Sequence, residues 1–335
     1  MIKEISLLSY RNFRAHKFVF DSGINLILGP NGSGKTNLLE AIGYLSQAKS
    51  FRRVPDRNLI AWGETFFRIE AIFEKDGLNH NIAIFYDSET ETKKISINNK
   101  VVERATILFS TLPSLISSDR DQDIIDGPPR ERRRIINRLI SITSSEYMRL
   151  IQDYSKVLEN KNFLLRNKKV DEIKPWNQKQ QQLSIEIVRH RKKFMEKIKD
   201  HFLTLSQEFL KGKKAQVTYV PSADEETSFD SFIKEELERG HSFHGPHRDS
   251  IEFLIEGKPA KIYASEGEKR LIILAFYFTF LNIYNPNSMV ILDEPFSVLD
   301  KRGVELVLSH LNTQSFISAP YFDLESSKIS KVIEL

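Results

Sequence analysis

The sequence predicts an α/β protein in which a parallel sheet and an antiparallel β part are interrupted by an inserted helical lobe. Strand-like segments fill the first third of the chain, helical periodicity dominates from Arg130 to Leu210, and strand-like segments resume near Asp249. The order of strands, then helices, then strands again along the chain indicates that the helices are inserted into one strand-rich domain. We therefore predict a domain made of residues 1–112 and 241–335, with residues 113–240 forming an inserted antiparallel helical hairpin.

The first third of the chain alternates strand-like segments with turns. Its early strands are MIKEISLL, KFVF and INLILG, and the apolar spacing from Leu38 to Leu45 predicts a helix after Thr36. Later strand-like segments are FFRIEAIFE, HNIAIFY, KKISIN and ATILFS. The sequence KDGLN predicts a hairpin turn, and Asn98-Asn99 predicts a second one.

The helical part consists of two runs with apolar residues three and four positions apart. One run extends from Tyr147 to Leu165 and the other from Leu183 to Phe209, with Pro175 between them. After the lobe we expect strands in DSIEFLIEGKPAKIYA, a helix after Ser265, a buried parallel strand in SMVILDEP, and a helix in residues 304–311.

The composition limits the class of protein. Hydrophobic residues make up 40% and charged residues 28% of the 335 residues, which is ordinary for a soluble globular protein. The chain contains no cysteine, which excludes disulfides and thiolate metal sites. The first residues lack the apolar core of a signal peptide, and the longest apolar run, residues 271–281, is too short to span a bilayer. We expect a cytoplasmic protein without a membrane partner.

Basic residues gather in two places on a chain whose net charge is +4. Five arginines lie within residues 130–138, and RHRKK occupies residues 189–193. Such clusters are ordinarily solvated helix faces, and they also suit a polyanionic partner. Either interpretation is open from the clusters alone.

A glycine-rich segment at residues 29–36, GPNGSGKT, fits the phosphate-loop pattern G-x-x-x-x-G-K-[ST]. The strand INLIL precedes it and an apolar-periodic helix follows, which is the context that the motif requires. Glycines allow backbone N–H groups to surround phosphates, Lys35 supplies positive charge, and Thr36 offers a hydroxyl to Mg²⁺.

The segment MVILDEP supplies acidic residues that complement this loop. Four apolar residues form a strand that ends at Asp293, where a carboxylate can hold Mg²⁺ directly or through water. The neighbouring Glu294 can accept a proton from an attacking water or orient it.

The segment ASEGEKR precedes a strongly apolar helix. Ser265 is a suitable N-cap, and glutamates suit the first turn of a helix. The same helix start can bind an anion that is supplied from elsewhere. The two interpretations are compatible, because the capping geometry also presents the N–H groups.

The motifs together resemble the ABC-type ATPases, and Ser265-Glu266-Gly267-Glu268 resembles their signature motif. Along nearly the whole chain the sequence is similar to the RecF family of bacterial recombination-repair proteins. The segments that carry this resemblance are YRNFRAH, NGSGKTNLLEAI, KSFR, DRNLIAWG, GPPRERRRIINRL, WNQKQQQLS, GPHRD, ASEGEKR, ILDEPFSVLD and QSFIS.

The resemblance implies an ABC-type ATPase head with ATP and Mg²⁺ as cofactors. It implies slow ATP hydrolysis, ATP-dependent homodimerisation, binding of single-stranded, duplex and gapped DNA, and cooperation with RecR, RecO and RecA. Its implied catalytic residues are Glu294, Lys35 and Ser265, with Thr36 and Asp293 on the metal. Its implied nucleotide-binding residues are Arg14, Asn31, Gly32, Ser33, Gly34, Lys35, Thr36, Asn37, Ser265, Gly267 and Glu268. For DNA contact we assign Arg132, Arg133, Arg134, Arg189, Arg191 and Lys192.

One departure from the family pattern affects function. The signature of this family reads S-Q-G-Q, whereas this chain has glutamates at both amide positions. Negative charge at Glu266 and Glu268, close to a phosphate, opposes ATP-driven closure unless Lys269 or Arg270 compensates it.

Other functions remain as alternatives. A metal site at His244 and His247 would need further ligands, which the sequence does not supply. An ATPase of an anti-phage or other DNA-maintenance system would need a second carboxylate-rich site. A structural head with a degenerate nucleotide site is opposed by the intact Lys35, Thr36 and Asp293.

Overall fold

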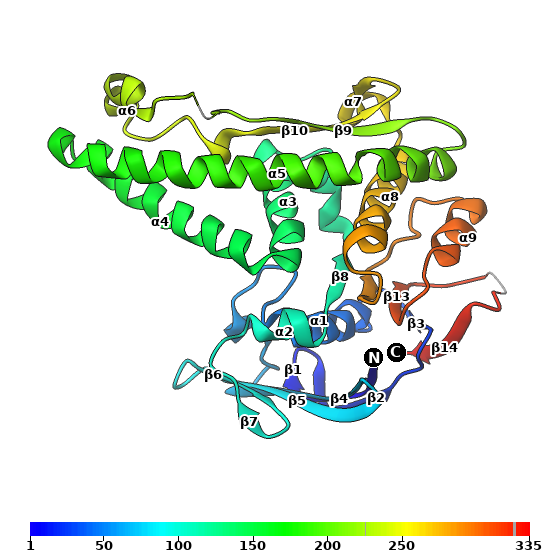
Figure 1. Cartoon of the computed structure of the whole chain (residues 1–335). Helices are drawn as coiled ribbons and strands as arrows, with labels where there is room; N and C mark the ends of the chain where they lie inside the picture. The colour runs from blue at the N-terminus through cyan, green and yellow to red at the C-terminus, as the bar shows by residue number, and fades with distance from the viewer. Residues whose placement is uncertain (225, 324–325) are drawn as a thin grey trace. The chain divides into compact units, whose positions relative to one another are not determined.

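The computed structural model describes residues 1–224, 226–323 and 326–335 (Figure 1). By contacts the chain divides into two compact units, which are described separately. The first unit contains Met1–Arg120 and Asn285–Leu335, and the second contains Asp121–Tyr284. Residues 241–284 therefore pack with the helices of the second unit. The sequence predicts one domain of residues 1–112 and 241–335 and an inserted helical lobe of residues 113–240. These bounds of the ATPase domain stay a prediction.

The first unit contains an antiparallel sheet. Its strands follow the order β2-β1-β4-β5-β6-β7. Their bounds are β1 Ile2–Tyr10, β2 Phe13–Val19, β4 Phe66–Lys75, β5 Leu78–Asp87, β6 Thr92–Ile97 and β7 Lys100–Val101. Both predicted hairpin turns are confirmed, because Lys75 pairs with Leu78 and Ile97 pairs with Lys100.

A fully parallel sheet forms the other β layer of this unit. Its order is β14-β3-β13-β12-β8. Its strands are β3 Ile24–Leu28, β8 Ser114–Ser117, β12 Met289–Leu292, β13 Ser315–Ala319 and β14 Ile329–Glu334. All residues of β12 and β13 are buried, as expected for central parallel strands, which are covered on both faces.

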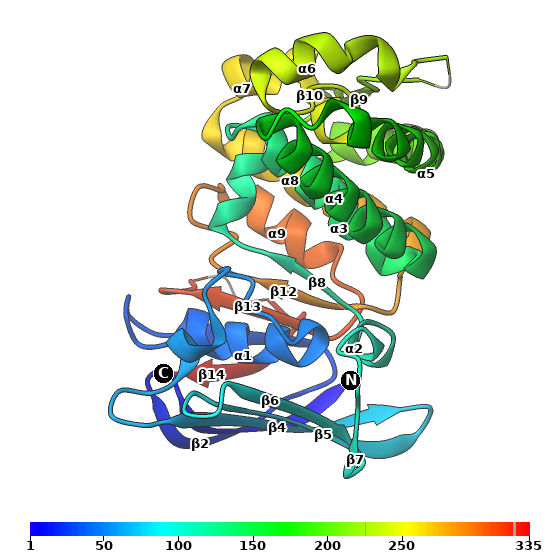
Figure 2. The same ribbon diagram turned by 90° about the vertical axis from the view of Figure 1, so that its left-hand side faces the viewer.

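Helix α1 (Lys35–Gln47) lies between these two sheets (Figure 2). Its apolar positions, among them Leu38, Ile42 and Leu45, are fully buried in a core that both sheets share. The further helices of this unit are η1 Asp56–Leu59, α2 Ile107–Thr111, η2 Asp119–Ile124, which crosses into the second unit, and α9 Lys301–Ser309. Because α1 is fixed on both faces, the loop that precedes it is held in one position at the edge of the parallel sheet.

The prediction of a strand in ATILFS is wrong. Residues 107–111 form the short helix α2 instead, and the adjacent strand is β8, which begins after Pro113. A short apolar segment carries no periodicity long enough to separate helix from strand. Leu108 is the buried residue of α2, so one side chain anchors the turn while Ile107 remains exposed.

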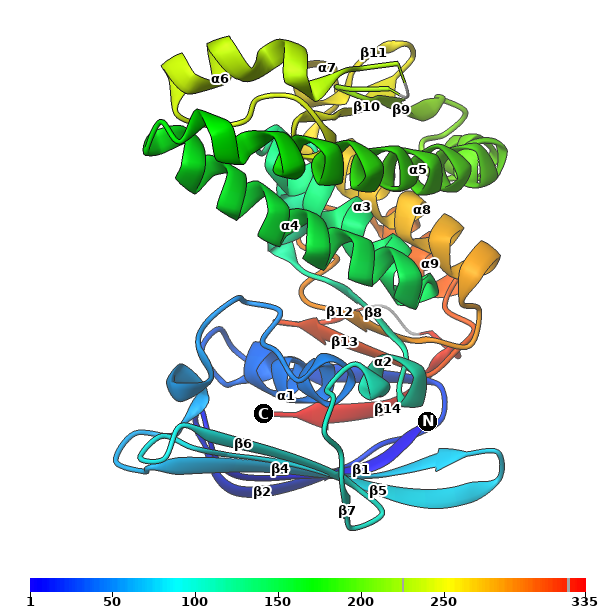
Figure 3. The same cartoon turned by 60° about the vertical axis from the view of Figure 1, so that its left-hand side comes forward.

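The second unit is built around the long helix α5 (Ile173–Phe209), which runs beside α4 (Ser145–Arg166) (Figure 3). This confirms the predicted pair of long helices, with Pro175 in the first turn of α5. The other elements are α3 Pro129–Thr143, η3 Val170–Glu172, β9 Ala215–Val220, η4 Phe229–Phe232, α6 Ile233–Arg239, η5 Pro246–Arg248, β10 Ser250–Ile255, β11 Lys258–Pro259, α7 Ala260–Tyr263 and α8 Glu266–Tyr284. The sheet β11-β10-β9 is antiparallel.

A buried polar cluster ties α5 to the segment GPHRD. Arg191 is 1% exposed and donates to the carboxylate of Asp249, to the carbonyl of Pro246 at 2.8 Å and to the hydroxyl of Tyr147 at 3.1 Å. A buried guanidinium with a carboxylate partner and further acceptors is satisfied internally, so this cluster fixes the fold of the unit. Among the described residues no helix is long and apolar enough to cross a membrane.

Candidate functional site

The loop between β3 and α1 is held open by glycines. Gly32 and Gly34 have φ values of 87° and 113°, which side chains disfavour. A Cβ on Gly34 would lie 2.5 Å from the Nδ2 atom of Asn12, so no other residue fits there without a shift. Lys35 begins α1 and is 3% exposed, and its Nζ donates to the carbonyls of Gly29 at 2.9 Å and Pro30 at 3.1 Å. The loop and its lysine therefore form a compact, positively charged helix start.

Asp293 follows β12 at the same edge of the parallel sheet. Its carboxylate accepts hydrogen bonds from Thr36 Oγ1 at 3.0 Å and Ser318 Oγ at 2.7 Å. Burial raises the pKa of Asp293, while the hydrogen bonds from Ser318 and Thr36 act in the opposite direction. Neighbouring ligands on an octahedral Mg²⁺ ion are about 3 Å apart, so the Thr36 and Asp293 oxygens have the spacing that such an ion needs.

Glu294 lies next to Asp293 and reaches Lys35. Its Oε1 is 3.6 Å from the Lys35 Nζ, and its backbone N–H donates to Ser318 Oγ at 2.9 Å. Glu294 has a φ of 46°, an uncommon backbone conformation for a residue other than glycine. Such strain persists where the surroundings hold the residue in place, and here it directs a 39% exposed carboxylate toward the lysine.

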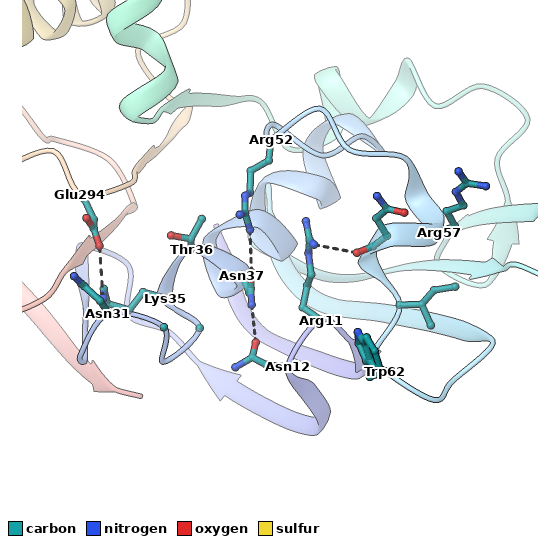
Figure 4. A pocket seen from close by; sticks show the side chains of 14 residues that line it. Arg11, Asn12, Asn31, Lys35, Thr36, Asn37, Arg52, Arg57, Trp62 and Glu294 are labelled. Atoms are coloured by element: carbon teal, nitrogen blue, oxygen red, sulfur yellow. Dashed lines mark hydrogen bonds and ion pairs between the residues drawn. The ribbon is translucent and has the colours of Figure 1, made fainter.

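Lys35, Thr36 and Glu294 face a cavity of about 980 Å³ in the first unit (Figure 4). Asp293 is not a lining residue and is connected to the cavity by its hydrogen bond from Thr36. Of the predicted residues, Asn31, Gly32, Gly34, Lys35, Thr36, Asn37 and Glu294 line it. Ser33 is not among the lining residues, and its Oγ is buried without a hydrogen-bond partner among the described residues. Arg14 lies exposed on β2 and is not a lining residue. The phosphate-loop prediction and the carboxylate prediction thus meet in one cavity.

Other lining residues were not predicted from the sequence. They are Arg11, Asn12, Arg52, Arg57, Asn58, Ile60 and Trp62. Arg11 makes a bidentate ion pair with the fully buried Glu40, at 2.9 and 3.0 Å, so its charge is already matched. Asn12 accepts a hydrogen bond from Asn37 at 2.8 Å and donates to the Ser33 carbonyl at 3.1 Å. The signal that could have identified Asn12 and Arg11 was their place in the tight β1–β2 turn.

Ser265 is exposed at the start of α8 in the second unit and forms a reciprocal cap with Glu268. The Glu268 N–H donates to Ser265 Oγ at 3.3 Å, and the Ser265 N–H donates to Glu268 Oε2 at 2.8 Å. This is a capping box, so the structural interpretation of Ser265 is confirmed. Gly267 occupies the first turn of the same helix.

Both signature glutamates have cationic partners. Lys213 Nζ lies 2.7 Å from Glu268 Oε1, and this contact lowers the pKa of Glu268. Lys269 Nζ lies 2.8 Å from Glu266 Oε1 and also 2.8 Å from Asp126 Oδ1. Lys269 was one of the two compensating cations expected from the sequence, whereas Lys213 was not expected.

The basic clusters separate into exposed and internal residues. Arg189 and Lys192 are exposed on α5, with Arg189 2.8 Å from Glu186. Arg134 is half-exposed and lies 2.7 Å from Glu131. The assignment of Arg191 to DNA contact is corrected, because its guanidinium is buried and occupied by Asp249.

Arg132 and Arg133 are half-buried and support the backbone. Arg132 donates to the Gly127 carbonyl at 3.0 Å, and Arg133 donates to the Asp249 carbonyl at 2.9 Å. Desolvation lowers the pKa of both guanidinium groups, but they remain charged at any ordinary pH. Replacement of either residue would therefore disturb the fold as well as the surface charge.

The two histidines of HGPHRD lie in ordinary structural environments. His247 contacts the Tyr154 hydroxyl at 2.7 Å and the Ser242 carbonyl at 3.1 Å, and burial lowers its pKa to about 4. His244 stacks on Phe232 with ring centroids 3.8 Å apart. No group of metal-ligating side chains occurs among the residues that the structure describes.

A phosphate loop, a strand-end aspartate and an adjacent glutamate at the edge of a parallel sheet define an ATPase head of the ABC and SMC type. The family described as RecF/RecN/SMC N-terminal domain matches residues 1–319. The DNA replication and repair protein RecF of Chlorobium limicola is 31% identical over 95% of this chain and 94% of its own length, and that of Moorella thermoacetica is 29% identical over 95% and 89%. The chain belongs to the RecF family, which confirms the resemblance found in its motifs.

Solved structures agree with this assignment. The recombination mediator protein RecF-ATP of the RecFOR pathway superimposes with a TM-score of 0.84 at 27% identity, covering 97% of this chain and 94% of that one. The RecF-ATPrS structure gives a TM-score of 0.87 at 25% identity, covering 100% and 96%. An Smc head bound to the C-terminal winged-helix domain of ScpA, 17% identical with a TM-score of 0.64, shares the fold. The predicted fold class is therefore confirmed.

Proposed function

We propose that this protein is an ATP-dependent DNA-binding ATPase of recombinational repair, a RecF-like clamp that dimerises on ATP. The proposal rests chiefly on the cavity lined by Lys35, Thr36 and Glu294, with Asp293 hydrogen-bonded to Thr36, within a chain of the RecF family. The clamp binds DNA at gaps and junctions and helps to load the recombinase. Its partners are RecR, RecO and RecA, and its place of work is the bacterial cytoplasm.

The residues at the phosphate end of the cavity fit a nucleoside triphosphate with Mg²⁺. Thr36 and Asp293 would hold the ion, which neutralises charge on the phosphate oxygens when it is bound. Lys35 and the N–H groups of the loop bind the phosphates and orient them. Glu294 accepts the proton of the attacking water, and its strained backbone fixes the direction of the carboxylate.

Ser265 and the capped start of α8 serve the nucleotide of a second copy of the chain. An exposed N-cap with its first-turn N–H groups is suited to an anion approaching from outside its own unit. Each complete site then needs Lys35 from one protomer and Ser265 from its partner. ATP turnover is slow, because the dimer has to close before hydrolysis. DNA stimulates this turnover.

DNA binding is expected to depend on the exposed cations of α5. Replacing Arg189 and Lys192 with glutamine should weaken binding to every DNA sequence alike. The slope of the logarithm of the affinity against the logarithm of the salt concentration should become shallower by about 2, because each lost phosphate contact removes about one released counterion. The measurement is the affinity for gapped, single-stranded and duplex DNA over a range of salt concentrations, with and without ATP.

The matched control replaces Lys94 and Lys100 with glutamine, because these two lysines are likewise exposed cations and lie on the antiparallel sheet of the first unit. It should retain the wild-type affinity and slope. Equal losses in the two double variants would show that only net charge matters and would remove α5 from the interface. The proposed function fails if wild-type affinity for DNA is the same with ATP, without ATP and in Lys35→Ala.

The partners of the signature glutamates should control dimerisation. Lys213→Met leaves the charge of Glu268 uncompensated next to the phosphates of the nucleotide that the partner protomer binds. We expect the affinity of the two protomers for each other in the presence of ATP to fall by about fivefold. The effect is modest because the ion pair between Lys213 and Glu268 is partly exposed. Adding Glu268→Gln should restore it, since glutamine keeps the capping box without the charge. Sedimentation with ATP measures the dimer.

Lys214→Met provides the control, because Lys214 is exposed beside Lys213. If Lys213→Met dimerises as well as Lys214→Met does, then Glu268 does not lie near the phosphates in the dimer. If glutamine at position 268 fails to rescue the Lys213 variant, the lysine acts through some contact other than this ion pair.

A further inference from the structure

Trp62 is an indole exposed to an unusual degree. It is 96% exposed, whereas Leu59 and Ala61, just before it in the chain, are 0% and 5% exposed. Tryptophan is among the largest apolar side chains and is ordinarily well buried. Trp62 is also a lining residue of the 980 Å³ cavity that contains the phosphate loop. Its exposed surface is therefore available to a molecule bound in that cavity.

The backbone holds Trp62 in place without help from packing of the indole. The Ala61 N–H donates to the Ser9 carbonyl at 2.8 Å, which attaches the segment to the end of β1. The Glu64 N–H donates to the Ala61 carbonyl at 3.1 Å, and Gly63 has a φ of 84°, so residues 61–64 form a closed turn with glycine at its third position. The ring is thus presented by a fixed turn, which lowers the entropy lost when it contacts a ligand.

The cavity has chemically different ends. Figure 4 shows Lys35 and Glu294 at one end and Trp62 with Arg57 at the other. The charged end suits phosphates, whereas the far end offers the aromatic face of Trp62 beside the polar side chain of Arg57. A nucleotide has the same polarity, with a charged phosphate chain at one end and a flat heterocycle at the other.

We propose that Trp62 is the platform on which the base of the bound nucleotide stacks. The inference rests on the proposed function, because it requires a nucleotide whose phosphates lie at Lys35. Stacking on an indole face tolerates any base, since every base has a π-face. Trp62 therefore contributes affinity for the base and does not select adenine over guanine. A DNA base on Trp62 is the less favoured occupant, because the ring shares its cavity with the phosphate loop.

The test compares a nucleotide with its phosphate chain alone. Trp62→Ala should bind ATP and GTP about tenfold more weakly than the wild type, the loss expected for one stacking contact, and should bind inorganic tripolyphosphate unchanged. Trp62→Phe should recover most of the affinity for ATP, since it keeps an aromatic face. Lys35→Ala provides the contrast, because it should lose tripolyphosphate as well as ATP. Calorimetry measures all three ligands without a fluorophore.

Fluorescence gives a second readout that a merely structural role would not change. The chain has two tryptophans, and Trp176 is not a lining residue of the cavity but packs against Leu164, Leu165 and Ile173 in the second unit. In a Trp176→Phe background, ATP and GTP should quench the emission of Trp62, whereas tripolyphosphate should leave it nearly unchanged.

Four results would overturn the inference. Unchanged affinity for ATP in Trp62→Ala would exclude stacking, and an equal loss for tripolyphosphate would assign Trp62 to the shape of the cavity. Quenching by a single-stranded oligonucleotide in place of ATP would assign the indole to DNA. If the wild-type protein binds neither ATP nor tripolyphosphate, the proposed function fails and this inference fails with it.

Discussion

Glu294→Gln is expected to bind ATP with nearly wild-type affinity and to hydrolyse it at least about 100-fold more slowly. The amide has the shape of the carboxylate but cannot take a proton from the attacking water, and general-base catalysis contributes about 10² to 10⁴ in rate. Because Glu294 is 3.6 Å from Lys35 without being its main partner, the substitution leaves the lysine's hydrogen bonds to the loop carbonyls in place. The variant should therefore accumulate as an ATP-bound dimer.

Single-turnover hydrolysis and light scattering with ATP provide the two measurements for this variant. Glu305→Gln, an exposed acidic residue of α9 in the same unit, is the matched control and should behave as the wild type does. If Glu294→Gln turns over at the normal rate, another group activates the water. If it loses ATP binding, the carboxylate serves mainly to position Lys35.

The site chemistry could be predicted from the sequence because its motifs are local. The glycine spacing and the run of four apolar residues before Asp293 specify a loop and a strand end without reference to the rest of the chain. β3 and β12 are separated in the sheet by β13, yet their carboxyl ends lie at one edge because all the strands are parallel. That geometry brings Thr36 and Asp293 within 3.0 Å of each other across 257 positions of sequence.

The far end of the cavity could not be predicted in the same way. Arg57 lies in η1 and Trp62 in the turn that follows it, and backbone hydrogen bonds to the end of β1 fix the position of this segment, a contact that no local residue pattern specifies. The ion pair between Lys213 and Glu268 could not be predicted for the same reason. Lys213 follows α5 and lies 55 positions before Glu268 in the chain. Contacts between distant loops depend on the tertiary fold, which composition and periodicity do not specify.

The error at Arg191 had a detectable signal. Ile187, Arg191 and Phe194 lie on one face of α5 at helical spacing, and all three are buried. An arginine inside an apolar stripe indicates an internal ion pair, whereas Arg189 and Lys192 fall outside the stripe. The position of each residue around the helix therefore distinguishes the internal cation of RHRKK from its surface cations. The number of positive charges in this segment does not make that distinction.

Mixing two inactive variants is expected to restore ATP hydrolysis if Ser265 serves the nucleotide of the partner protomer. Lys35→Ala removes the charge at the phosphates, and Ser265→Arg places a bulky side chain where a γ-phosphate would enter. Each alone should be inactive, although Ser265→Arg should still bind ATP within its own chain. In a mixed dimer one site carries both lesions while the other has intact Lys35 and Ser265. Random pairing then limits recovery to about a quarter of wild-type hydrolysis if the two sites act independently.

The cap at Ser265 requires its own control in this experiment. Loss of an N-cap costs about 1 kcal/mol of stability, so Ser265→Ala reports the effect of lost capping without the bulk of arginine. If Ser265→Ala retains most hydrolysis and Ser265→Arg retains none, the block comes from the side chain at the dimer interface. Absence of rescue together with two inactive parents is expected if both sites must be intact for either to hydrolyse ATP, and equally if Ser265 serves the nucleotide of its own chain, so that result does not decide between the two arrangements. Normal hydrolysis and dimerisation by Ser265→Arg would instead show that ASEGEKR is only a helix cap, and the shared active site would have to be abandoned.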